Sequence, residues 1–268
     1  MQVSVNGVSL WVESRGEGSP VVLLHGLGSS GMDYEHVAPG LARKRRVIVP
    51  DVRGHGRSDK PPGPYSVSMF AADLEAALDH MGVKAAHVAG LSMGGMIAFQ
   101  MAVDRPDLVR SLTIINSGPA LVPRGFQQRY ALWLRLFILR WMGPKAWAKV
   151  LASRLFPKPE QETQRRQVIE RFGSNPKGPY LAATKALIGW SVLDRVKEIA
   201  CPVLVLGSDR DYSPTEVKRA YVALLRDARL VEIRDSGHAA PSDQPGQVLA
   251  AMESFLDEVE GAPAPARQ

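Results

Sequence analysis

A serine flanked by glycines is the residue of this sequence with the clearest potential for chemistry. Residues 90–95 read Gly-Leu-Ser-Met-Gly-Gly and match the pattern Gly-x-Ser-x-Gly, with Ser92 at its centre. On a very tight turn a serine adopts strained backbone angles, and glycines at 90 and 94 remove the clashes that side chains would cause. An apolar segment precedes the pattern and a helical one follows it, as an exposed nucleophile requires. We therefore predict that Ser92 is a nucleophile.

A serine hydroxyl needs a base to attack at neutral pH, and His238 is the best placed of the six histidines. His238 lies just after the last predicted strand, at the sheet edge where parallel sheets bind ligands. His25 and His55 lie in glycine-flanked loops at the same edge, where we expect them to satisfy backbone groups of those loops. The other three histidines fall on helix or strand patterns, which favours structural roles.

The base in turn needs a carboxylate that fixes its tautomer and stabilises its charged form. Residues 207–214 follow a predicted strand and offer Asp209 and Asp211. The loop after the preceding strand offers none, because no acidic residue occurs at positions 108–159. Asp211 lies further into its loop than Asp209. For either aspartate, an ion pair with Arg210 is the alternative role.

Acyl transfer also needs two N–H donors aimed at the oxygen of the tetrahedral intermediate. Leu27 lies in the segment His-Gly-Leu-Gly at 25–28, and Met93 directly follows Ser92. Their backbone N–H groups are the predicted pair of donors, so the identity of the two side chains matters less.

Strands that alternate with helices are predicted to hold these residues in place. Wholly apolar runs predict buried strands at 21–24, 46–50, 87–90, 112–115 and 202–207. Further strands are predicted at 2–6, 8–14 and 228–234, and helices at 67–80, 93–104, 215–226 and 244–258. Strands that are apolar on both faces belong in a parallel sheet covered by helices. The pattern is typical of an α/β fold.

The alternation stops at residues 119–199, which form helical stretches interrupted by prolines and contain no β-branched apolar run. This segment carries 15 Lys and Arg but only 5 Asp and Glu, whereas the whole chain has a net charge of +6. Because the strand pattern returns at 202, we interpret the segment as an insertion between two strands rather than a separate domain. We predict a core of residues 1–118 and 200–260, and a disordered tail at 261–268.

Residues 126–142 of this insertion are apolar almost all round. One face of such a helix would pack on the core, and the rest would contact substrate, another helix, a second subunit or a lipid surface. Packing within the insertion is the interpretation we favour. The functional alternative is an apolar acyl-binding wall, with the candidates Trp133, Phe137, Trp141 and Trp190. The basic residues could attract anionic substrates or membranes, or could simply be solvated.

The composition argues against several classes of protein. Hydrophobic residues make up 45% and charged residues 22% of the chain, which is ordinary for a globular protein. The first residues lack the features of a signal peptide, and no apolar run approaches the length of a membrane span. The lone Cys201 cannot form an internal disulfide and fits a cytoplasmic location. We expect no metal, no cofactor and no nucleic-acid partner, because no corresponding motif is present.

Taken together, the motifs resemble the α/β-hydrolase fold family over about residues 3–258. The matching segments occur in the family's order: 25–28, 51–58, 90–95 and the loops that carry Asp211 and His238. The resemblance implies a mostly parallel eight-stranded sheet flanked by helices, with residues 119–199 as a helical cap over the active site. It also selects Asp211 over Asp209, because the family places the acid four residues after the glycine that ends the strand. We interpret the 51–58 loop as structural.

The members that the chain resembles are esterases, C–C hydrolases and cofactor-free haloperoxidases. We therefore expect cleavage of small carboxylic esters with an apolar acyl group, through an acyl-enzyme on the Ser92–His238–Asp211 triad. A serine nucleophile argues against haloalkane dehalogenases and epoxide hydrolases, which use an aspartate. The same triad acting on a C–C bond, a thioester or a peracid is the alternative. A ligand receptor or scaffold is the non-enzymatic alternative, and dimerisation through the cap is an open possibility.

Overall fold

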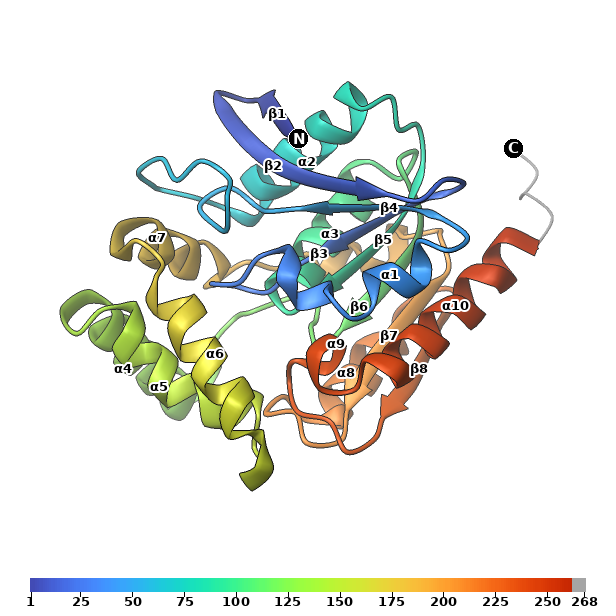
Figure 1. The fold of residues 1–268 in the computed structure, drawn as a ribbon. Helices are drawn as coiled ribbons and strands as arrows, with labels where there is room; N and C mark the ends of the chain where they lie inside the picture. Colours follow the sequence, from blue (N-terminus) through green and yellow to red (C-terminus); the bar gives the residue numbers. More distant parts are fainter. Residues whose placement is uncertain (262–268) are drawn as a thin grey trace.

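The computed structural model in Figure 1 describes residues 1–261 and contains one eight-stranded sheet of order β1-β2-β4-β3-β5-β6-β7-β8. The strands are β1 (Gln2–Val5), β2 (Val8–Arg15), β3 (Pro20–Leu24), β4 (Arg46–Pro50), β5 (Ala86–Leu91), β6 (Val109–Ile115), β7 (Val203–Ser208) and β8 (Ala228–Ile233). β2 runs antiparallel to β1 and β4, and every later pairing is parallel. The predicted α/β fold with a mostly parallel eight-stranded sheet is confirmed.

Helices cover both faces of this sheet because its central strands are apolar on both faces. Along β3, Val22 and Leu24 face a core shared with the helices α2 and α3, whereas Val21 and Leu23 face a core shared with α1 and α10. Figure 1 shows α1 and α10 in front of the sheet. The core helices are α1 (Ala38–Leu41), α2 (Val67–His80), α3 (Met93–Asp104), α8 (Thr215–Val222), α9 (Ala240–Asp243) and α10 (Pro245–Gly261), with a 3₁₀ turn η1 (Gly31–Tyr34).

The inserted segment 119–199 is helical and leaves the sheet between β6 and β7, which are neighbours in it. It consists of α4 (Gly125–Trp141), α5 (Pro144–Leu155), η2 (Pro159–Gln161), α6 (Glu162–Gly173), α7 (Lys177–Leu187) and η3 (Leu193–Glu198). Figure 1 shows α4 to α7 grouped at one side of the sheet. A small apolar cluster between α5 and α6, which includes Leu155 and Phe172, gives this group a core of its own.

The two ends of the insertion lie beside each other. Ala120 and Ser191 form an antiparallel bridge, and the Val192 N–H donates to the Pro119 carbonyl oxygen over 2.8 Å. The chain therefore enters and leaves the insertion at one point above β6 and β7.

Element boundaries differ from prediction mainly near the C-terminus. α8 ends at Val222 rather than 226, and the chain then turns before β8. α10 runs through Gly261, which we had placed in the tail, and the rest of the predicted tail lies outside the described residues.

Candidate active site

Ser92 lies on the turn between β5 and α3 and has the backbone angles that the motif predicts. Its φ is +53° and its ψ is −112°, a conformation that L residues rarely adopt. The Ser92 N–H donates to the Ile115 carbonyl oxygen over 3.0 Å, which ties the turn to the neighbouring strand β6. The surrounding sheet therefore maintains the strain and directs the side chain away from the strands.

The glycines around Ser92 are required by space. A Cβ atom on Gly90 would lie 2.2 Å from the carbonyl carbon of Gly94, and one on Gly94 would lie 2.1 Å from the carbonyl oxygen of Leu24. Both contacts are with backbone, which cannot move aside as a flexible side chain can. The turn, β3 and α3 thus approach one another too closely for any residue but glycine at these two positions.

His238 and Asp211 form a hydrogen-bonded pair at the ends of β8 and β7. The distance from His238 Nδ1 to Asp211 Oδ1 is 2.7 Å, and both side chains are buried. Burial raises the pKa of Asp211, but the hydrogen bond and charge of His238 and the charge of Lys218 lower it more, so the net shift is downward. An ionised Asp211 accepts the Nδ1–H, which leaves His238 Nε2 as a proton acceptor.

The two candidate aspartates have different partners. Asp209 accepts hydrogen bonds from the N–H groups of Asp235 and Ser236, at 2.8 and 2.9 Å, and so holds the loop that carries the histidine. Asp211 contacts His238 and also Lys218, whose Nζ lies 2.7 Å from Asp211 Oδ2. Asp211 therefore has the geometry of an acid that orients His238. Asp209 instead stabilises the loop on which His238 lies.

Lys218 is a part of the site that sequence reasoning missed. It is fully buried on α8, where its Nζ also donates to the Ser213 carbonyl oxygen over 2.7 Å. A buried ammonium needs a charged partner, and Asp211 provides it. The spacing of seven residues between Asp211 and Lys218 gave no signal, because the lysine looked like any other on an amphipathic helix.

Tyr212 is a second residue that sequence reasoning missed. Its hydroxyl lies 2.9 Å from His238 Nε2, and the two rings stack with centroids 4.2 Å apart. The residue as a whole is 52% exposed, yet burial raises the pKa of its hydroxyl; the charge of Asp211 adds to the rise, and the charge of Arg135 partly offsets it. Tyr212 thus donates to the nitrogen that must accept the Ser92 proton.

We expect Tyr212→Phe to raise kcat/KM for a small ester by about 5-fold, because it removes a hydrogen bond worth about 1 kcal/mol from His238 Nε2. Tyr130→Phe on the exposed face of α4 is the matched control and should change nothing. The measurement is the steady-state rate with a nitrophenyl ester. A loss of about 100-fold would instead show that the phenol takes part in proton transfer.

The predicted oxyanion donors belong to two different segments of the chain. Leu27 follows β3 and borders the cavity, and Met93 is the first residue of α3. Within residues 1–261, neither N–H donates to a backbone acceptor, so both are free to bind an oxygen. The Leu27 loop is held by the inserted segment, because Asn175 Nδ2 donates to the Gly28 carbonyl oxygen over 2.8 Å.

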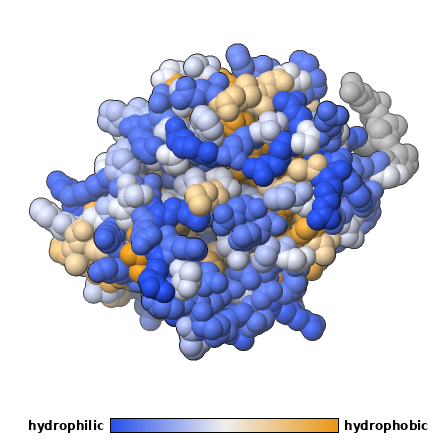
Figure 2. Space-filling model, viewed as in Figure 1, coloured by the Kyte–Doolittle hydropathy of each residue, from blue (hydrophilic) through white to orange (hydrophobic). Residues whose placement is uncertain are grey.

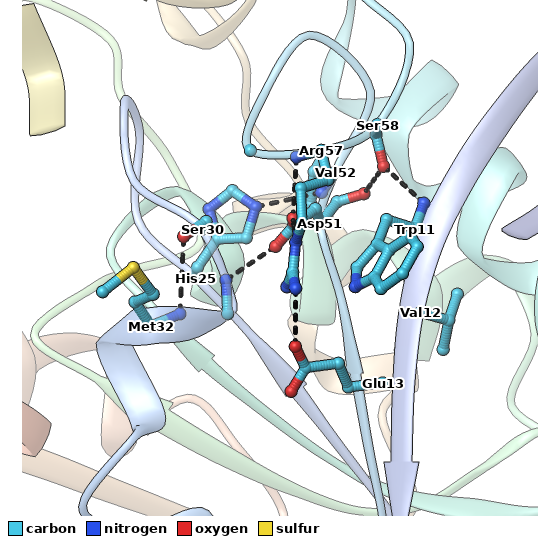
Figure 3. Close-up of polar contacts among 12 residues, drawn as sticks. Trp11, Val12, Glu13, His25, Ser30, Met32, Asp51, Val52, Arg57 and Ser58 are labelled. Carbon is cyan, nitrogen blue, oxygen red and sulfur yellow. Dashed lines mark hydrogen bonds and ion pairs between the residues drawn. The ribbon is translucent and has the colours of Figure 1, made fainter. Parts of the chain in front are cut away.

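His25 and the 51–58 loop form a support behind this loop (Figure 3). The Val52 N–H donates to His25 Nε2 over 2.9 Å, while His25 Nδ1 lies 2.8 Å from the Gly26 carbonyl oxygen. Asp51 accepts from the N–H groups of Gly31 and Arg57, at 2.8 and 2.9 Å. The polar groups of His25 and of the 51–58 loop thus bond to neighbouring loop residues. This favours a structural role for both the 25–28 loop and the 51–58 loop.

His55 is also structural. It is fully buried beside His25, with ring centroids 5.2 Å apart, and burial together with the charge of His25 lowers the pKa of His55 to about 3. A histidine that stays neutral at all physiological pH values serves packing rather than proton transfer.

A cavity of about 520 Å³ lies between the sheet edge and the inserted segment. Ser92, His238, Tyr212 and Leu27 border it on the sheet side. Most of the opposite wall is apolar and includes Leu121, Leu132, Leu151, Leu155, Phe172 and Leu187. The cavity can therefore hold a mainly apolar molecule against the serine.

The four predicted wall residues do not border this cavity, which corrects the sequence interpretation. Trp133, Phe137 and Trp141 are 55%, 44% and 68% exposed on the outer face of α4. Trp190 packs on the core, and its Nε1 donates to Gln100 Oε1 over 2.8 Å. The sequence predicted an apolar helix but did not indicate which of its faces would line the cavity. In the structure Leu132 and Arg135 of α4 line it, in place of Trp133, Phe137 and Trp141.

The outer face of α4 carries a ladder of stacked aromatic rings. Successive ring centroids from Phe126 to Tyr130, Trp133 and Phe137 are 6.2, 5.8 and 5.4 Å apart. In Figure 2, hydrophobic residues reach the surface at the side of the molecule where Figure 1 places α4 and α5, with hydrophilic residues beside them. The ladder brings together four aromatic rings that are between 44% and 82% exposed.

Two further properties of residues 1–261 bear on the site. They include no group of three or more His, Cys, Asp or Glu side chains placed to hold a metal ion. None of their helices combines the length and hydrophobicity of a membrane-spanning segment.

The comparisons with known proteins agree with this fold. A model of the α/β hydrolase fold family matches residues 19–245. The "Putative carbamate hydrolase RutD" of Azorhizobium caulinodans is 28% identical over 94% of this chain and 96% of its own. A soluble epoxide hydrolase of a Corynebacterium species is 35% identical, over 57% of this chain and 54% of its own. A thermophilic esterase of Thermogutta terrifontis is 27% identical, with a TM-score of 0.88 over 97% of this chain and 99% of its own.

The fold, the site and these relatives define a hydrolase of the α/β type. The chain belongs to the α/β-hydrolase fold family.

Proposed function

We propose that this protein is a serine hydrolase that cleaves carboxylic esters through an acyl-enzyme, with no cofactor. One observation carries the proposal. His238, whose Nδ1 lies 2.7 Å from Asp211, borders the same cavity of about 520 Å³ as Ser92, a serine with a strained backbone. The likeness to a solved esterase supports the same activity.

In this mechanism Ser92 Oγ attacks the ester carbonyl while His238 Nε2 takes its proton. Tyr212 must first release Nε2, because its hydroxyl occupies that nitrogen at 2.9 Å. The N–H groups of Leu27 and Met93 stabilise the oxyanion. His238 then protonates the departing alcohol, and a water activated by the same nitrogen releases the acid. Asp211 stays ionised throughout and stabilises the imidazolium.

We expect the protein to hydrolyse nitrophenyl esters, with kcat/KM rising by up to about 4-fold for each methylene added to the acyl chain. The reason is that each buried methylene contributes about 0.8 kcal/mol of apolar transfer energy. The rise should stop at the chain length that fills the cavity of about 520 Å³. Initial rates with acetate to dodecanoate esters measure the effect.

Ser92→Ala is the control for background hydrolysis in that series. Labelling of Ser92 by a fluorophosphonate separates an enzyme from a ligand receptor or scaffold, because only an activated serine reacts. If the wild-type protein neither hydrolyses any ester nor reacts with the label, the proposal is wrong. Parallel assays with thioesters, peracid formation and C–C substrates separate the other chemistries of this triad.

Carbamate cleavage is the second candidate, and the Azorhizobium relative is the observation that favours it. A carbamate carbonyl is attacked by a serine in the same way as an ester carbonyl. Epoxide opening is less compatible with the site, because attack by Ser92 would leave an ether that water cannot release. A carbamate and an ester of the same alcohol, assayed side by side, distinguish the two candidates.

A further inference from the structure

Arg135 is a charged residue on the inner face of α4. It borders the cavity together with Ser92, whereas Arg129 and Arg140 of the same helix are exposed. Helical spacing explains why Arg135 faces the cavity. Leu132 and Arg135 are three residues apart on one face of α4, and Trp133 and Phe137 lie on the opposite, exposed face. Arg135 therefore brings a positive charge to a wall that is mostly apolar but also includes Arg171 and Gln167.

This charge lacks a matching carboxylate. Arg135 Nε is fully buried and has no hydrogen-bond partner within residues 1–261, and no acidic residue occurs at positions 108–159. The Trp147 ring lies under the guanidinium, 5.1 Å from its centroid, but offers no hydrogen-bond acceptor there. Arg171, which borders the same cavity, differs because it pairs with Asp33 at 3.6 Å. A buried N–H of a charged group is costly when it has no acceptor, and an anion that reached Arg135 would supply one.

Two neutral donors next to Arg135 are also unused. Trp147 Nε1 and the Tyr180 hydroxyl are buried and have no partner within the described chain. Burial raises the pKa of Tyr180 and nearby Arg135 lowers it in part, as expected for adjacent groups. Tyr180 packs against Gly28 of the loop that carries Leu27. The three donors therefore lie where the inserted segment meets the catalytic loops.

We propose that the cavity binds esters that carry a carboxylate at the far end of the acyl chain, held by Arg135, which borders the cavity. The proposal rests on the proposed esterase function. Because Arg171 is paired with Asp33, the guanidinium of Arg135, unpaired within residues 1–261, can neutralise one negative charge, and its planar fork matches a carboxylate. The apolar wall would hold the methylenes between that carboxylate and the ester at Ser92.

The test compares monoethyl adipate with ethyl hexanoate, two esters of six-carbon acids, by chromatography of the released acids. We expect wild-type kcat/KM to favour the half-ester by about 10- to 100-fold, the range for a charge-assisted hydrogen bond. Arg135→Met should bring the ratio close to one, mainly through a higher KM for the half-ester. Arg135→Lys should keep part of the preference, and Arg140→Met on the exposed face should keep all of it.

Binding of adipate itself gives a readout that does not depend on turnover. Calorimetry with Ser92→Ala should detect adipate binding, and adding Arg135→Met should weaken it at least 10-fold while adding Arg140→Met should not. A wild-type ratio near one, or adipate binding that survives Arg135→Met, would overturn the proposal. If adipate binds through Arg135 but neither ester is cleaved, the proposed function fails and the anion site stands.

Discussion

Ser92→Ala is expected to reduce kcat for ester hydrolysis by about 10⁶-fold, the loss found when a serine protease loses its nucleophile. The hydroxyl is the only group removed, and without it the Asp211–His238 pair has no atom to activate. The remaining rate should reflect substrate binding and the two free N–H donors of Leu27 and Met93. Single-turnover kinetics with a nitrophenyl ester, at enzyme concentrations above substrate, can measure so large a decrease.

Ser174→Ala is the matched control, because Ser174 is exposed at the end of α6 and bonds only to the Arg171 carbonyl oxygen. It should retain full activity. Ser92→Ala should fold normally, since alanine keeps the Cβ atom and the backbone bonds of the turn do not involve the hydroxyl. Activity within 10-fold of wild type in a folded Ser92→Ala protein would exclude Ser92 as the nucleophile.

Asp211→Asn is expected to lower kcat by about 10⁴-fold, as for the triad acid of a serine protease. An asparagine amide can donate to Nδ1, which would place the imidazole proton on Nε2 and leave no acceptor for the Ser92 hydroxyl. The change also leaves Lys218 buried without a charged partner, so we expect lower stability as well. Measurement of kcat together with thermal unfolding separates the two effects.

Asp209→Asn is the comparison that tests the choice of acid. Asp209 bonds only to backbone N–H groups in the loop that carries His238, so we expect a loss of less than about 10-fold in kcat. Lys218→Met combined with Asp211→Asn removes both members of the buried pair and should recover stability without recovering activity. If Asp209→Asn costs more activity than Asp211→Asn, the assignment of the acid is wrong.

The sheet and the helices that flank Ser92 could be predicted because local signals agree there. Ser66 caps α2 by accepting the Met69 N–H over 3.0 Å, and the helix starts at Val67 as predicted. α3 begins after Ser92 and ends at Asp104, just before Arg105-Pro106. In both cases residues next to one another in the chain determine the boundary.

The rest of the site depends on contacts between distant residues. The contact of Tyr212 with His238 could not be predicted from the sequence. It depends on the conformation of a loop that brings the tyrosine hydroxyl to a histidine 26 positions away. Arg135 and Trp133 are two positions apart, yet one faces the cavity and the other solvent. Packing against α5 and α7 decides which side of α4 faces the cavity. The sequence could not predict that side, because both sides of the helix carry hydrophobic residues.

The bridge between Ala120 and Ser191 makes the insertion a modular element. Because its two ends are already joined by hydrogen bonds, the residues between them can change in length and sequence without moving β6 or β7. The residues of the proposed triad, Ser92, His238 and Asp211, all lie outside this exchangeable stretch. Changes in the insertion can therefore alter which molecules enter the cavity while Ser92, His238 and Asp211 stay in place. A grafted insertion would have to keep the bond from Asn175 to the Gly28 carbonyl oxygen, which holds the loop of Leu27.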